Sequence, residues 1–126
     1  FIIHSVKEEV VASSKVTKVL RPLLDDFAQI AGATVKCVEF DPSVTLRTTK
    51  KVVKALGKHR TAALLKDNGA ICCGVSPDEA EASEMVTAKN CKTFVASRMF
   101  DKVKYIGRLD SLLMNVVYRV KYSKQK

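Results

Sequence analysis

Two short, mostly apolar segments separated by an Asn-Gly pair constrain the fold of this chain more than any other feature. The segments are residues 61–65 and 70–74, and Asn68-Gly69 stands between them. An Asn-Gly pair is the strongest short-range signal for a β-hairpin, because both residues tolerate the left-handed backbone of a tight turn. The sequence therefore predicts an antiparallel hairpin, and with it a sheet on which the rest of the chain packs.

Helical patterns lie on both sides of this hairpin. Before it, residues 21–30 place apolar side chains at helical spacing and stop at Gly32, a residue that favours helix ends. After it, Ser76 supplies an N-cap and Pro77 a first helical position, which predicts a helix to about Met99. The other predicted elements are strands over 1–4 and 34–40 and helices over 5–14, 48–56 and 109–120.

Two of these helices carry more specific predictions. Ser5 with Glu8 three residues later is a capping-box pattern, so Ser5 is predicted to cap the helix over 5–14. In the last helix, apolar residues recur three and four positions apart, which predicts a buried face. Its members are Leu112, Leu113, Val116 and Val120. The order of elements predicts a layered α/β or α+β domain, with a frayed basic end over 121–126.

Length and hydropathy exclude some protein classes. The 126 residues suit a single domain with its own core. No apolar run approaches the roughly 20 residues that a membrane span needs, so no membrane partner is predicted. The chain starts at Phe1, inside an apolar run, which leads us to expect an internal fragment or a chain cut before its natural start.

The net charge of +9 is concentrated in two blocks of the chain. Residues 44–66 carry seven basic and no acidic side chains, and residues 98–126 carry eight basic and two acidic ones. Such blocks are typical of phosphate-binding surfaces. However, the chain has no Trp, and neither block interleaves aromatic residues for base stacking. A solvated basic face or a pocket for an anionic metabolite is therefore favoured over nucleic acid.

The cysteines and histidines by themselves indicate few functional sites. No pair of the four cysteines has C-x-x-C spacing, which argues against a zinc cluster and favours buried, reduced thiols in an intracellular protein. His4 ends a predicted strand, where it is either a hydrogen-bonded structural residue or a pocket residue. His59 lies in a basic loop and is interpreted as solvated. Asp67 and Asn68 are interpreted as turn residues.

The hairpin and the helix after it resemble the class II aldolase/adducin family. Residues 63–74 followed by 76–80 are similar to the family's pattern of LL-x-N-H-G, a short apolar strand, a Gly and a helix that opens with acidic residues and Ala. Upstream, Ile2-Ile3-His4-Ser5 is similar to the family's metal-binding strand, H-x-H-S. The match covers most of this chain and the C-terminal half of the family's domain.

This resemblance implies a three-layer α/β/α sandwich with a mixed sheet that is incomplete in this chain, residues 1–126 forming one domain. It also implies a cytoplasmic homo-oligomer, a tetramer in the family. Active members are sugar-phosphate aldolases and pentulose-phosphate epimerases. They hold a divalent metal, usually zinc, on three histidines, and the metal stabilises an enediolate as a Lewis acid.

The sequence departs from the family at these ligands. With His4 at the second ligand position, Ile2 occupies the first; with His4 at the first, Val6 occupies the second. The third position falls at Asn68, whose amide binds zinc poorly compared with imidazole. We therefore expect His4 and Asn68 at the metal position, with zinc or another divalent metal weakly bound or absent. Asp67 and Asn68 are the candidate substrate-binding residues.

The sequence leaves three candidate functions. The favoured one is a class II aldolase-like protein of the sugar-phosphate aldolase and epimerase family with a degenerate metal site, acting as a binding or scaffold module. The second is an active metal-dependent aldehyde-lyase or epimerase on a phosphorylated sugar, in which Asp67 or residues outside this chain complete the ligand set. The third is nucleic-acid binding through the two basic blocks. No catalytic acid or base is predicted.

Overall fold

A five-stranded mixed sheet forms the centre of the protein. The computed structural model describes residues 1–40, 45–100 and 104–124. Its strands are β1 (Ile2–Ser5), β2 (Val19–Leu20), β3 (Val35–Val38), β4 (Ala62–Leu65) and β5 (Gly69–Cys73), in the order β1-β5-β4-β3-β2. Strands β3 and β4 are parallel, and the other neighbours are antiparallel. The predicted mixed sheet is confirmed.

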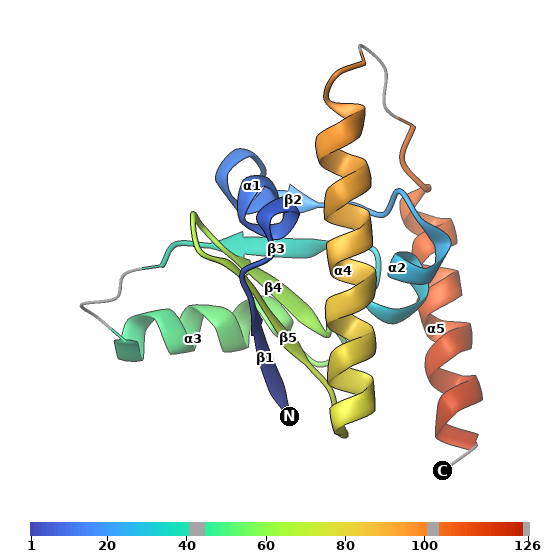
Figure 1. Cartoon of the computed structure of the whole chain (residues 1–126). Coiled ribbons are helices and arrows are strands. Elements are labelled where there is room, and N and C mark those ends of the chain that lie inside the picture. The colour runs from blue at the N-terminus through green and yellow to red at the C-terminus, as the bar shows by residue number, and fades with distance from the viewer. Residues whose placement is uncertain (41–44, 101–103, 125–126) are drawn as a thin grey trace.

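Helices cover both faces of this sheet (Figure 1). Helices α1 (Glu8–Val16) and α4 (Pro77–Ser97) pack together on one face, and α3 (Thr45–Leu56) packs against β3 and β4 on the other. Helices α2 (Asp25–Ile30) and α5 (Arg108–Lys124) lie against each other beside α4. The predicted three-layer arrangement is therefore present. In the described part of the chain, no helix has the length and apolar character of a membrane span.

The predicted hairpin is formed by β4 and β5. Leu65 pairs with Gly69, and the pairing continues to Ala62 opposite Cys72. All four residues of β4 are buried, which explains why its sequence is a continuous apolar run rather than an alternating one. The capping box at the start of α4 also forms: the Ser76 hydroxyl accepts from the Glu79 amide at 3.2 Å, and the Glu79 carboxylate accepts from the Val75 amide at 3.1 Å.

The predicted cap at Ser5 is wrong. Ser5 is the last residue of β1 and pairs with Ala70, so its backbone is extended and its side chain is buried. Helix α1 begins three residues later, and its N-cap is Lys7, without a side-chain cap. Pairing with β5 outweighs the local capping preference because it continues the sheet by one more residue.

A buried amide holds the segment before α2. Asn90 of α4 is fully buried, and its Oδ1 accepts from the amides of Leu23 at 2.8 Å and Leu24 at 3.2 Å. Its Nδ2 donates to the Arg21 carbonyl at 3.0 Å. These bonds hold residues 21–24 outside the helix, so α2 begins at Asp25 rather than at residue 21 as its apolar spacing predicts. The short strand β2 before this segment has no sequence signal of its own.

The predicted buried face of α5 is wrong. The helix itself forms and runs to Lys124, and residues 125–126 of the predicted frayed tail lie outside the described residues. Its buried side chains include Ser111 and Asn115. The residues predicted to be buried are instead exposed: Leu112, Leu113, Val116 and Val120. The same helical spacing of apolar residues occurs both in a face that packs on the core and in an apolar face that stays exposed.

Helix α3 leaves part of its face of the sheet open. An apolar groove of about 410 Å³ runs between α3 and the strands β1, β4 and β5. Val52 and Leu56 line it from the helix, and Ile71 and Ile2 line it from the sheet. Ile2 is 71% exposed although it belongs to the sheet.

The four cysteines are free thiols. Burial raises the pKa of Cys72 to about 12 and that of Cys91 to about 11, so both remain protonated at neutral pH. Burial also raises the pKa values of Cys37 and Cys73, but these two side chains are only half-buried. The prediction of buried thiols therefore holds fully for two of the four.

Replacing Asn90 by Ala tests the role of its amide. We expect Asn90→Ala to lower the free energy of unfolding by about 3 kcal/mol, because two amides and a carbonyl lose their partner in a buried region. Urea unfolding followed by circular dichroism measures the change. Lys92→Ala is the matched control, since Lys92 lies on the same helix with an exposed side chain. Equal effects of the two substitutions would contradict this role.

Candidate functional site

His4 and Asn68 meet at one end of the sheet. Strand β1 runs antiparallel to β5 with His4 opposite Ile71, which brings the end of β1 next to the hairpin turn. The Nε2 atom of His4 lies 2.8 Å from the Asn68 carbonyl oxygen, across 64 residues of sequence. The structure thus brings together two residues that the family resemblance places in one site.

Gly69 allows this close approach. Its φ of +94° is a conformation that side chains rarely adopt, and a Cβ atom there would overlap the carbonyl oxygen of Ser5. Only a residue without a side chain lets β1 lie against β5 at this point. The position of His4, one residue before Ser5, depends on that contact.

The side chains of Asp67 and Asn68 are engaged within and beside the turn. Asp67 has a φ of +65° and lies 3.5 Å from the Nζ atom of Lys15 on α1. The side-chain Nδ2 of Asn68 donates to the Lys66 carbonyl at 2.8 Å. Both residues therefore take part in the turn, as their residue types predict. Their role in substrate binding stays a prediction.

These residues do not supply the donor set of a three-histidine zinc site. Because the Asn68 carbonyl accepts the bond from His4, Nε2 of that imidazole carries the proton, and His4 offers one donor atom for a metal, Nδ1. Ile2 shares the face of β1 with His4, but its side chain is apolar. No group of three or more His, Cys, Asp or Glu side chains within the described ranges is placed to hold a metal ion.

A basic pocket of about 180 Å³ lies beside the hairpin turn. Three lysines and one glutamate line it: Lys15 and Lys18 from the α1 region, Glu39 after β3, and Lys66 from the turn. Lys15 and Lys66 make long, exposed ion pairs, of 3.5 Å each, with Asp67 and Glu39. Exposed pairs of this kind contribute little stability, so their ammonium groups are free to exchange partners. The pocket is suited to a small anion.

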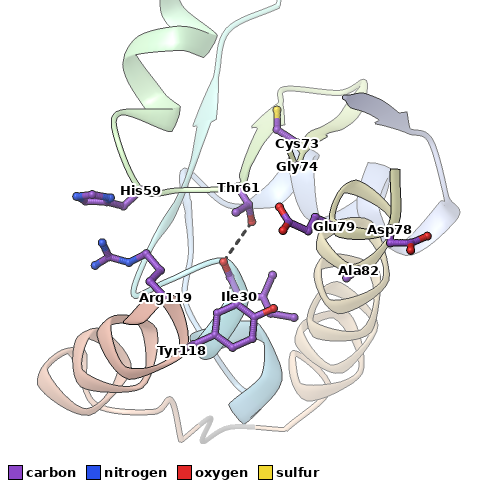
Figure 2. A pocket seen from close by; sticks show the side chains of 10 residues that line it. All are labelled: Ile30, His59, Thr61, Cys73, Gly74, Asp78, Glu79, Ala82, Tyr118 and Arg119. Carbon is purple, nitrogen blue, oxygen red and sulfur yellow. Dashed lines mark hydrogen bonds between the residues drawn. The ribbon is translucent and has the colours of Figure 1, made fainter. Parts of the chain in front are cut away.

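A second pocket, of about 440 Å³, lies at the other end of β5 (Figure 2). That end is about 14 Å from the turn, at the usual rise of an extended strand. His59 and Arg119 lie close together on one side, and Glu79 and Asp78 lie on the other (Figure 2). Thr61 at its back donates to the Ile30 carbonyl at 3.3 Å. His59 is exposed, as predicted, but it also lines this pocket.

Sequence reasoning missed both pockets. The three lysines of the basic pocket come from two segments far apart in the chain, and only Lys66 belongs to one of the two basic blocks, over 44–66 and 98–126. His59 and Arg119 lie sixty residues apart in the chain. No periodicity or motif joins residues so far apart, so only the folded chain reveals these clusters.

Comparison with known proteins points to one family. A family model described as the class II aldolase and adducin N-terminal domain matches residues 1–95. A search of curated proteins finds no match.

Among solved structures, an L-fuculose 1-phosphate aldolase is similar with a TM-score of 0.79 and 16% identity, covering 94% of this chain and 55% of that one. YgbL from Escherichia coli, described as a candidate aldolase/epimerase/decarboxylase, has a TM-score of 0.72 and 19% identity, with 90% and 56% coverage. The L-fuculose-1-phosphate aldolase from Thermus thermophilus has a TM-score of 0.65 and 21% identity, with 82% and 56% coverage. The chain thus shares their fold and spans about half their length.

Substituting Gly69 tests the approach of β1 to the turn. We expect Gly69→Ala to lower the free energy of unfolding by about 3 kcal/mol or more, since a Cβ there meets backbone as well as an unfavourable φ. Chemical denaturation measures the loss.

Gly57→Ala is the matched control for that substitution. Gly57 also has a positive φ, of +58°, but a Cβ there would meet only the end of the Arg60 side chain at 3.6 Å. It should cost about 1 kcal/mol, the penalty of the left-handed conformation alone. If Gly69→Ala costs no more than Gly57→Ala, the close approach is not the constraint described.

Proposed function

Since this chain belongs to the class II aldolase and adducin family, we propose that it is a sugar-phosphate-binding member with a degenerate metal site, which does not carry out zinc-dependent carbon–carbon cleavage. The observation that supports this most directly is the side chains at the ligand positions, where His4 is one imidazole in place of three. Its Nε2 donates to the Asn68 carbonyl, which leaves Nδ1 as the one ring nitrogen with a lone pair. The neighbouring ligand positions hold an apolar side chain and an amide.

The metal chemistry of the family has no donor set among the described residues. Class II aldolases are typically zinc-dependent, and a bound zinc acts there as a Lewis acid. Here Ile2 lacks any donor atom, and the amide of Asn68 is turned to the Lys66 carbonyl. We therefore assign His4 and Asn68 a structural role, in which they join the end of β1 to the turn.

The basic pocket supports the proposed class of ligand. Two of the solved relatives are named for a phosphorylated sugar, L-fuculose 1-phosphate. Lys15, Lys18 and Lys66 surround a space beside the turn that is suited to a phosphate group. In this proposal the lysines hold the phosphate, and Asp67 and Asn68 face the sugar.

The second candidate is an active aldehyde-lyase or epimerase. It is favoured by one fact: the chain spans about half the length of its solved relatives, so polypeptide outside it can supply further ligands. His4 would then bind the metal through Nδ1, while its Nε2 keeps the bond to the Asn68 carbonyl. With either candidate, we propose that the protein self-associates, as members of its family do. We also propose a cytoplasmic location, because it suits the four free thiols.

Metal content and cleavage activity separate the two candidates. We expect elemental analysis of the purified protein, without added chelator, to find no stoichiometric zinc or other divalent metal. We also expect no cleavage of L-fuculose 1-phosphate with added zinc. About one metal per chain that is lost in His4→Ala, together with chelator-sensitive cleavage, would establish the active enzyme instead.

Anion binding tests the basic pocket. Titration calorimetry with L-fuculose 1-phosphate should show binding that weakens by roughly tenfold in Lys18→Gln/Lys66→Gln, and that falls as salt is raised. Unphosphorylated L-fuculose serves as the control ligand, and Lys92→Gln as the control variant, since Lys92 is an exposed lysine outside this pocket. Equal binding of the sugar and its phosphate would remove the lysines from the proposal.

A further inference from the structure

The pocket at the far end of β5 is built from parts of the chain that lie far apart in sequence. His59 and Thr61 come from the segment between α3 and β4, Glu79 from the first turn of α4, and Arg119 from α5 (Figure 2). Its volume of about 440 Å³ is in the range of sites that hold small molecules. It shares no lining residue with the lysine pocket at the hairpin turn.

Arg119 is held in the wall of this pocket by a bond that leaves the end of its guanidinium unused. Its Nε donates to Oδ1 of Asn115 at 3.0 Å, and Nδ2 of Asn115 donates to the Gln29 carbonyl at 2.8 Å. The Arg119 side chain is half-buried, yet within residues 1–40, 45–100 and 104–124 no carboxylate forms an ion pair with it. Its terminal nitrogens can therefore bind a ligand carboxylate through two parallel bonds. His59 lies on the same side, so its imidazole can donate a further bond to that carboxylate (Figure 2).

The opposite side of the pocket is acidic. Asp78 and Glu79 line it from the first turn of α4. One carboxylate oxygen of Glu79 accepts from the Val75 amide at 3.1 Å, and this bond of the capping box fixes the carboxylate at the edge of the pocket. A carboxylate in this position attracts the ammonium group of a ligand.

The surface between the two charged sides is mainly apolar. Ile30 of α2, Ala82 of α4 and the ring of Tyr118 belong to it. Thr61 at the back already uses its hydroxyl, which donates to the Ile30 carbonyl at 3.3 Å and accepts from the Ser83 hydroxyl at 2.9 Å. This part of the pocket therefore offers contact to a hydrocarbon chain rather than hydrogen bonds to the hydroxyl groups of a sugar.

The balance of charge disfavours a ligand with several negative charges. The described residues that line the pocket include two carboxylates and one guanidinium. A phosphate dianion would be attracted by Arg119 and repelled by Asp78 and Glu79. A ligand with one negative and one positive end meets the opposite charge on each side. The pocket thus selects for a different chemistry from that of the lysine pocket.

From these observations we propose that the pocket binds a small zwitterion, in which a short hydrocarbon chain joins a carboxylate at one end to an ammonium group at the other. The carboxylate lies on Arg119 and His59, and the ammonium group faces Asp78 and Glu79. The hydrocarbon chain packs on the apolar surface between them. The chemical class is that of the ω-amino acids, and the site is additional to the proposed phosphate site.

Titration calorimetry with ω-amino acids of increasing length tests the ligand class. We expect saturable binding within the series 4-aminobutanoate, 6-aminohexanoate and 8-aminooctanoate, with one length favoured because the fold fixes the separation of the two charged sides. The matching fatty acid, which lacks the ammonium group, and the matching amine, which lacks the carboxylate, should each bind at least roughly tenfold more weakly. Absence of binding across the series, or equal binding of either singly charged analogue, would overturn the proposal.

Two substitutions test whether the ligand occupies this pocket. Arg119→Gln should weaken binding of the favoured amino acid by roughly tenfold, so that it binds no better than the matching amine. Glu79→Gln should weaken it by about fivefold, since it removes the charge and keeps an oxygen that can cap the Val75 amide.

Arg108→Gln is the matched control for these substitutions. Arg108 is an exposed arginine on the same helix as Arg119 and does not line the pocket, so this variant should bind as the native protein does. Circular dichroism verifies that the three variants fold. Native binding in both Arg119→Gln and Glu79→Gln would place the ligand elsewhere and contradict the assignment, as would an equal loss in Arg108→Gln.

Discussion

A single buried amide, that of Asn90, determines how the outer helices sit on the sheet. Its three hydrogen bonds from α4 hold residues 21–24 outside the helix and thereby fix where α2 begins. Helix α2 in turn offers the Gln29 carbonyl to Asn115 of α5. The position of α5 therefore depends on two side-chain amides in turn: that of Asn90, which fixes the start of α2, and that of Asn115, which binds α5 to α2. Polar bonds do this because the apolar side of α5 is turned outward.

The parts of the fold that sequence could predict are those with strong local chemistry. The turn at Asn68-Gly69 and the capping box at Ser76 both formed, because each depends on residues a few positions apart. Ser5 has an equally clear capping pattern, but its pairing with Ala70 depends on a strand 65 residues away. The α5 spacing predicted an apolar face correctly and its burial wrongly, because periodicity does not identify the surface that a helix packs on.

The candidate site, too, could be predicted from the sequence only in part. Resemblance to the family identified His4 and Asn68 as neighbours, and the fold brings them together. The direction of the imidazole bond and of the Asn68 amide could not be predicted, because both depend on backbone carbonyls of the folded turn. The pocket of Lys15, Lys18 and Lys66 could not be predicted either, because it forms only when the fold places β3 and the turn beside the end of α1.

The open groove between α3 and the sheet has a practical consequence for work on this protein. Dyes that become fluorescent on apolar surfaces are commonly used to detect partly unfolded states. A groove of about 410 Å³ that includes Ile2, Val52 and Ile71 offers such a dye a binding place in the native protein. Fluorescence at low temperature would then come from the folded state, and heating would first release the dye. Melting curves recorded with these dyes would be inverted or flat, whereas a backbone signal would follow unfolding.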